Sequence, residues 1–343
     1  MVEFFFEYGL FLAKAVTFVI AAGATTLAIV VFSRKGGGET GELTVEKLND
    51  RFREISATLR QAVLSKAEWK KESKREEKER KAADQAAGKA EPKSRVYVID
   101  FKGDIRATAV GSLREEVTAV LSLATAKDEV VLRLENFGGA VHEHGLAASQ
   151  LARIRARGIP LTAIVDKGAA SGGYMMACVA NHIIAAPFAV VGSIGVIAQI
   201  PNFNRALTDR GVDFEQVTAG KYKRTVTMFG RNTDEDRAKL REELEEVHSL
   251  FKNMVASNRP QLDIEQVATG EHWYGTRALE MRLIDELGSS DDYLLAAAAR
   301  ADVFHVTWRT KHTLQEKLIA AVRAAADQVE LWVGQRQQER TLP

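Results

Sequence analysis

The residues best suited to chemistry lie in the segment Gly168-Ala-Ala-Ser-Gly-Gly-Tyr174. The apolar residues 160–165 before it predict a buried strand, and the small residues after Ser171 predict a helix. A serine at such a corner can expose its hydroxyl beside unpaired backbone N–H groups, which is what a nucleophile needs. The N–H of Gly172 is placed to donate to an oxyanion. A glycine-rich turn with a serine N-cap explains the same residues without catalysis.

A serine nucleophile requires a base, and histidine is the commonest type. Three histidines lie near glycine turns or at the start of a strand: His142, His144 and His182. None has a carboxylate partner that the sequence can place, so we interpret each as structural.

Lysine is the second type of base, provided that burial lowers its pKa. Lys223 is the candidate we favour, because it follows the segment Phe214–Val217, which we expect to be a strand. Lys221 and Lys167 are rivals. By composition alone, all three are solvated surface lysines.

Strands alternate with helices around these residues, which predicts an α/β domain with a largely parallel sheet. In such sheets the ligand site lies beyond the carboxyl ends of the strands. The turns at Gly138-Gly139 and at 168–173 both directly follow strands, so we expect them at the same edge. The expected strands cover 96–101, 129–135, 160–166 and 182–186, and the expected helices cover 112–124 (opened by a Ser112–Glu115 capping box), 141–157, 172–180 and 234–257.

The N-terminus predicts a membrane anchor. Residues 15–32 carry no charge, and the apolar character extends back past Lys14, so residues 8–32 are long enough to cross a lipid bilayer as a helix. Glu3 and Glu7 replace the basic region of a cleaved signal peptide, which favours a retained anchor. Arg34 and Lys35 follow the span, and taken alone these charges place the rest of the chain in the cytoplasm.

Four regions follow from the composition. Residues 1–35 are the anchor, and residues 36–94 hold a juxtamembrane amphipathic helix (43–67) and a linker of Lys, Glu, Arg and Ala. Residues 95–300 form the globular α/β domain, which contains both Ser171 and Lys223. Residues 301–343 hold a strand and an amphipathic helix (314–333), which we interpret as an oligomer contact.

Composition excludes several functions. The 343 residues have a net charge of +1, which implies no general attraction to nucleic acid. The single cysteine, Cys178, rules out an intrachain disulfide and a cysteine-rich metal site. No zinc spacing, P-loop or convincing dinucleotide motif is present, so we predict neither a metal nor a cofactor.

Six motifs in one order resemble the SppA/SohB family of bacterial serine–lysine peptidases, and the anchor with its charged linker is most similar to the SohB branch. Together they cover about residues 95–287. Two departures are Asn136-Phe137, where relatives have Ser-Pro, and Arg282, where glycine is usual. The motifs are Asn136–Val141, Gly168–Tyr174, Gly192–Gly195, Ala219–Arg224, Trp273–Ala278 and Leu283–Asp285.

The resemblance implies that Ser171 is the nucleophile and Lys223 the general base. Gly138, or its neighbour Gly139, would supply the oxyanion hole together with Gly172. The implied fold is ClpP/crotonase-like, built of repeated β-β-α units. Relatives form rings or domes, and in some the serine and lysine of one site come from adjacent chains.

The function implied is that of an ATP-independent serine endopeptidase of the bacterial inner membrane, which cleaves membrane or signal-peptide-like polypeptides. Relatives act on the outer face of that membrane, so we favour the periplasmic side over the side indicated by the charges. Two alternatives stay open: a membrane-tethered oligomeric scaffold without catalysis, and a crotonase-type acyl-CoA enzyme. A Ser-His-Asp peptidase would need a histidine near residues 192–198, where none occurs.

Overall fold

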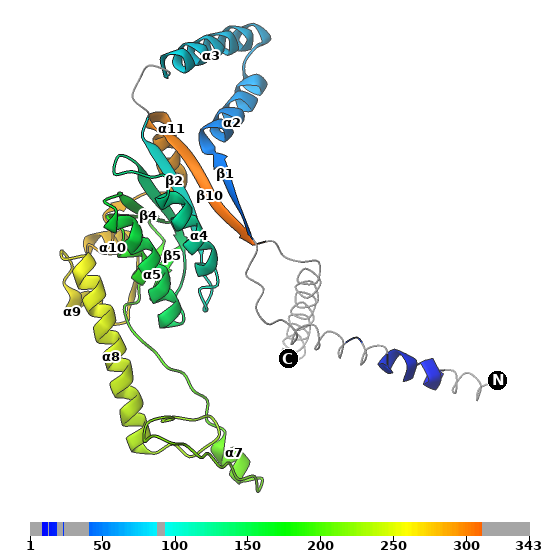
Figure 1. Cartoon of the computed structure of the whole chain (residues 1–343), viewed down its shortest axis with the longest axis vertical. Coiled ribbons are helices and arrows are strands. Elements are labelled where there is room, and N and C mark those ends of the chain that lie inside the picture. The colour runs from blue at the N-terminus through cyan, green and yellow to red at the C-terminus, as the bar shows by residue number, and fades with distance from the viewer. Residues whose placement is uncertain (1–8, 13, 19–22, 24–40, 88–92, 311–343) are drawn as a thin grey trace, which may run out of the picture. The chain divides into compact units, whose positions relative to one another are not determined.

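The computed structural model describes residues 9–12, 14–18, 23, 41–87 and 93–310. Residues 43–309 form one compact unit with a mixed α/β fold (Figure 1). Most of the predicted anchor and the whole helix predicted at 314–333 lie outside the described residues. Within the described part of the chain, no helix combines the length and the hydropathy needed to span a bilayer.

A seven-stranded sheet organises this unit, and from β10 to β9 all neighbouring strands run parallel. Its apolar, β-branched strands are buried, as is typical of parallel sheets covered on both faces. In spatial order the strands are β1 (Gly41–Lys47), β10 (Asp302–Thr310), β2 (Arg95–Lys102), β3 (Glu129–Glu135), β4 (Leu161–Val165), β6 (His182–Ala185) and β9 (Glu286–Leu287).

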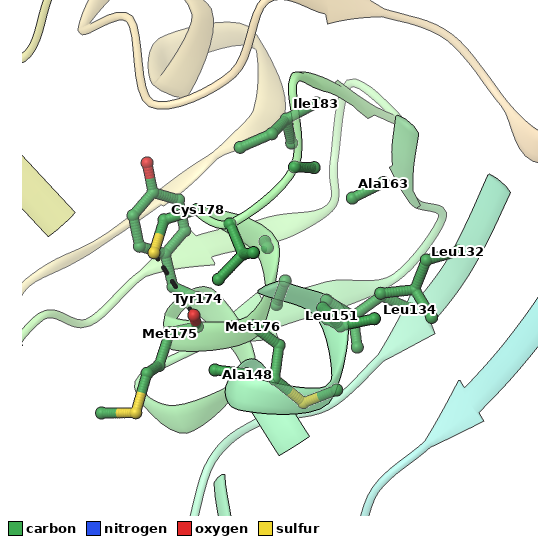
Figure 2. Close-up of a cluster of buried hydrophobic side chains, with 14 of the residues drawn as sticks. Leu132, Leu134, Ala148, Leu151, Ala163, Tyr174, Met175, Met176, Cys178 and Ile183 are labelled. Carbon is green, nitrogen blue, oxygen red and sulfur yellow. Dashed lines mark hydrogen bonds between the residues drawn. The ribbon is translucent and has the colours of Figure 1, made fainter. Parts of the chain in front are cut away.

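Each face of the sheet has its own hydrophobic core, because alternate strand residues point to opposite faces. The larger core packs against α4 (Val110–Leu121), α5 (Val141–Ala156) and α6 (Gly172–Ala177). Figure 2 shows Leu132, Leu151 and Met176 gathered in it. The smaller core packs against α2 (Leu48–Val63) and α11 (Ser290–Arg300).

A second, three-stranded sheet carries the segment singled out from the sequence. It consists of β5 (Gly168–Ala170), β7 (Val190–Gly192) and β8 (His272–Tyr274), the first two parallel and the last antiparallel. We expected a turn at residues 168–170, because glycine and alanine have low β propensity. Pairing with β7 and a bridge between Asn136 and Ala169 make this segment a strand that ends immediately before Ser171.

Residues 197–232, here called the arm, extend away from the two sheets and run alongside α8 (Asp234–Asn258), as Figure 1 shows. The arm contains α7 (Asn204–Thr208) but no strand at 214–217, so that prediction is wrong. The helix predicted at 234–257 is confirmed. Thr233 and Asp236 cap it reciprocally, which satisfies two backbone donors at its start.

Two further predictions need correction. Residues 43–47 belong to β1 at the edge of the sheet, and the helix predicted at 43–67 begins only at Leu48. The helix predicted to open at Ser112 begins at Val110 instead, without a side-chain cap. The charged linker was expected to be either disordered or loosely helical, and its residues 66–87 form the helix α3. The remaining helices are α9 (Ile264–Val267) and α10 (Gly275–Glu280).

The backbone at position 282 favours glycine, the residue that the family resemblance leads us to expect there. Arg282 has a φ of 61°, in the left-handed region that costs a non-glycine residue free energy. Its carbonyl oxygen accepts a hydrogen bond from the buried Arg259, which also forms a bidentate ion pair with Asp285. These contacts hold the strained backbone in place.

Glu116 on α4 makes the stability of the fold sensitive to pH. Its Oε1 accepts the N–H of Trp308 at 2.8 Å, and its Oε2 has no hydrogen-bond partner among the described residues. Burial raises the pKa of Glu116 to about 7, and the nearby Asp100 adds to that rise. Between about pH 4.5 and pH 7 the folded state keeps a proton on Glu116 that the unfolded state releases. The free energy of unfolding therefore falls as the pH rises through this range.

We expect Glu116→Gln, which keeps the acceptor oxygen, to stabilise the protein at pH 8 by at most about 3 kcal/mol. The gain should vanish only near pH 4 and below, where the carboxyl group is protonated in both the folded and the unfolded wild type. Thermal unfolding of both proteins at the two pH values measures this difference. An equal effect at both pH values would contradict the assignment.

Candidate active site

Ser171, the predicted nucleophile, has a strained backbone. Its φ and ψ are 52° and −119°, a region that residues with a side chain rarely occupy and that often marks functional sites. Two backbone hydrogen bonds hold it there: its N–H donates to the Gly192 carbonyl at 2.8 Å, and its carbonyl accepts from Met175 N–H at 3.0 Å. The hydroxyl makes no capping bond to α6, so Oγ is left available.

A small pocket, partly open to solvent, lies beside Ser171. Its walls are mainly apolar, and Gly139, Gly172 and Gly195 line it as well. An apolar pocket with a few polar groups is typical of ligand sites. The apolar walls come from Val141, Met175, Val196, Val247 and Phe251. The two residues from α8 carried no signal in the sequence that linked them to Ser171.

The predicted oxyanion turn lies against the serine. A Cβ added to Gly138 would lie 3.0 Å from Ser171 Oγ and 3.0 Å from Gly172 N, so only glycine fits there. Gly138 and Gly139 have φ values of 92° and 154°, and the N–H of Gly138 donates to Asn136 Oδ1 at 2.7 Å. Among the described residues, no acceptor bonds the N–H groups of Gly139 or Gly172.

Lys223, the predicted base, lies on the arm and is exposed. No hydrogen bond joins it to Ser171, and no described residue between 197 and 246 lines the pocket. The single chain therefore does not bring the predicted serine and lysine together.

The two rival lysines are engaged elsewhere. Hydrogen bonding to Tyr222, and to Glu235 at 2.9 Å, raises the pKa of Lys221, which favours its charged form and disfavours its action as a base. Lys167 donates to Glu135 at 3.1 Å.

The histidines near the glycine turns do not bond Ser171 either. His142 is exposed beside Glu143, and His182 pairs with Glu286 at the start of β6, at the opposite edge of the sheet. His144 is fully buried, with Nδ1 2.9 Å from the Ala140 carbonyl oxygen and Nε2 3.2 Å from Asn136 Oδ1. His248 of α8, which the sequence analysis did not single out, lies 3.3 Å from the Ile194 carbonyl.

Cys178 is a core thiol, as its small apolar neighbours in the sequence indicate. It is fully buried, and burial raises its pKa to about 12, so the reactive thiolate is disfavoured. Its Sγ donates to the Met175 carbonyl, the contact dashed in Figure 2. Within the described residues, no group of three His, Cys, Asp or Glu side chains could hold a metal ion.

A strained serine with an available hydroxyl, set between a glycine turn and an apolar pocket, is the arrangement of a serine hydrolase site. Comparison with known proteins identifies the protein family directly. Residues 3–151 match the model of "Peptidase family S49 N-terminal", and residues 153–304 match that of "Peptidase family S49". The chain belongs to peptidase family S49, a family of serine peptidases.

Individual proteins with similar sequences are also named as proteases. The chain is 46% identical to "Probable protease SohB" of Haemophilus influenzae over 90% of each chain. It is 44% identical to the protein of the same name from Buchnera aphidicola subsp. Acyrthosiphon pisum, over 92% of this chain and 93% of the relative. Among solved structures, a "1510-N membrane-bound stomatin-specific protease" mutant in complex with a substrate peptide matches 67% of this chain and 98% of its own, with 15% identity and a TM-score of 0.42.

Proposed function

We propose that this serine peptidase is an ATP-independent endopeptidase that works through a Ser–Lys dyad, with Ser171 as nucleophile and Lys223 as general base. The observation that carries the proposal is Ser171 itself: a strained residue with an available hydroxyl that faces a pocket. We assign the ClpP/crotonase-like fold on the resemblance of the motifs.

The chemistry follows from these roles. The neutral amine of Lys223 accepts the proton of the Ser171 hydroxyl while Oγ attacks the scissile carbonyl carbon. Backbone amides of the glycine turn and of Gly172 stabilise the oxyanion, at about 3–4 kcal/mol per donor. The lysine then protonates the leaving amine, and water hydrolyses the acyl-enzyme to release the second product and restore both residues.

A second copy of the chain would bring Lys223 to the serine. The arm exposes large apolar side chains, including Ile197 at 75% and Val217 at 97%, which a partner subunit would cover. Burial in such an interface also removes water from a lysine, as a lysine base requires. We therefore propose a homo-oligomer in which the serine of one subunit works with the lysine of the next.

The apolar walls of the pocket support a substrate class. Val141, Met175 and Phe251 suit a small or apolar side chain next to the scissile bond. Membrane or signal-peptide-like polypeptides supply such side chains. We propose that residues 8–32 anchor the enzyme in the bacterial inner membrane, with the catalytic unit on the periplasmic side.

The direct test combines cleavage with active-site labelling of the purified full-length protein. We expect a hydrophobic signal-like peptide to be cleaved without ATP, and a fluorophosphonate to modify Ser171, which mass spectrometry would localise. Modification of another residue that accounts for all of the lost activity would overturn the proposal.

A further inference from the structure

Asn136 is a fully buried polar residue that connects β3 to the strand carrying the nucleophile. Its N–H donates to the Gly168 carbonyl at 2.8 Å, and its own carbonyl accepts from Ala170 N–H at 3.0 Å. These bonds form a parallel bridge beside β5, which ends at Ser171. A displacement of Asn136 would therefore move the nucleophile as well.

The side chain of Asn136 holds the glycine turn. Its Oδ1 accepts the Gly138 N–H at 2.7 Å and lies 3.2 Å from His144 Nε2. The other ring nitrogen of His144 lies 2.9 Å from the carbonyl oxygen of Ala140, at the other end of the turn. The ring also packs under Gly172, where an added Cβ would lie 2.4 Å from His144 Cγ. Asn136 and His144 thus brace both sides of the oxyanion site.

The brace occupies one of the three glycine amides beside Ser171 and leaves the other two without an acceptor among the described residues. The Gly138 N–H is occupied by Asn136, whereas no acceptor bonds the N–H groups of Gly139 and Gly172 within the described part of the chain. Gly139 and Gly172 also line the pocket beside Ser171. These two amides are therefore the ones still available to a carbonyl oxygen that enters this pocket.

We propose that Asn136 is a positioning residue: it binds the Gly138 amide and so directs the Gly139 amide, together with that of Gly172, at the oxyanion. The proposal rests on the proposed function, because it concerns the same serine. It assigns the side chain of Asn136 the task of setting the conformation of the turn.

Three substitutions test the role of the acceptor oxygen. Asn136→Leu removes it at similar volume, Asn136→Ala removes it without adding bulk, and Asn136→Asp retains it. Asn181→Leu is the matched control, because Asn181 Oδ1 also accepts a backbone N–H, that of Leu161 at 3.0 Å, at the opposite edge of the sheet.

We expect the leucine and alanine variants to lose about 100-fold in kcat with KM changed less than about threefold, as for the loss of one oxyanion donor. Their affinity for a peptide aldehyde, which forms a tetrahedral adduct, should fall in parallel. Asn136→Asp and Asn181→Leu should stay within about fivefold of wild type. Unchanged kcat and aldehyde affinity in the folded leucine or alanine variant would overturn the proposal.

Hydrogen exchange at the Gly138 amide separates this proposal from the proposed function. Protection in the wild type and in Asn136→Asp, lost in Asn136→Ala, supports the brace even if no peptide is cleaved. Rapid exchange of Gly138 in the wild type would overturn the brace, whether or not Ser171 proves to be the nucleophile.

Discussion

Replacing Ser171 by alanine should reduce peptide cleavage by roughly 10⁴- to 10⁶-fold, the loss typical of removing a serine nucleophile. The reason is chemical: among the described residues that line the pocket, only Ser171 carries a hydroxyl group that could attack a substrate. The alanine variant should remain folded. The hydrogen bonds that hold position 171 come from its backbone, and both residues bear the same strain at a φ of 52°.

Ser193 provides the matched control. It has the same φ of 52°, and its N–H is bonded to the Glu271 carbonyl at 2.7 Å, yet it does not line the pocket. Ser193→Ala should therefore keep most of the activity. Initial rates, with circular dichroism and sizing of each variant, measure both effects. Cleavage by Ser171→Ala at more than a hundredth of the wild-type rate would refute its role as nucleophile.

The second large effect concerns Lys223. Its replacement by alanine should lower kcat by about 10³- to 10⁴-fold, because an unassisted serine hydroxyl is a poor nucleophile. Lys221→Ala is the control from the same loop. That lysine is engaged by Tyr222 and Glu235, so its loss should leave kcat within a few-fold of wild type.

Mixing two inactive variants tests whether the site is shared between subunits. When Ser171→Ala and Lys223→Ala chains are co-assembled in equal amounts, roughly a quarter of the sites should combine an intact serine with an intact lysine. Recovery of about that fraction of activity supports sharing. If co-assembled oligomers stay inactive, both residues act within one chain, and the arm must fold back toward Ser171.

Local sequence patterns predicted the central sheet well. Residues 129–135 were expected as a strand and form β3, and residues 160–166 contain β4, because runs of β-branched and apolar residues are stable only when buried between two layers. Segments that depend on distant partners were missed. The residues of β5 have little β propensity and form a strand only through pairing with β7, whereas residues 214–217 look like a strand but have no strand beside them.

The sequence by itself determined the candidate serine, the glycine turn and the peptidase family, because these depend on residue types at short spacing. The tertiary structure decided which groups meet. It strained Ser171 between β5 and α6, placed Phe251 of α8 in the pocket wall, and paired Asn136 with Ala169 of β5. It also left Lys223 away from the serine of its own chain. The lining of the pocket combines residues as far apart in the chain as Gly139 and Phe251, and short-range patterns contain no record of such pairs.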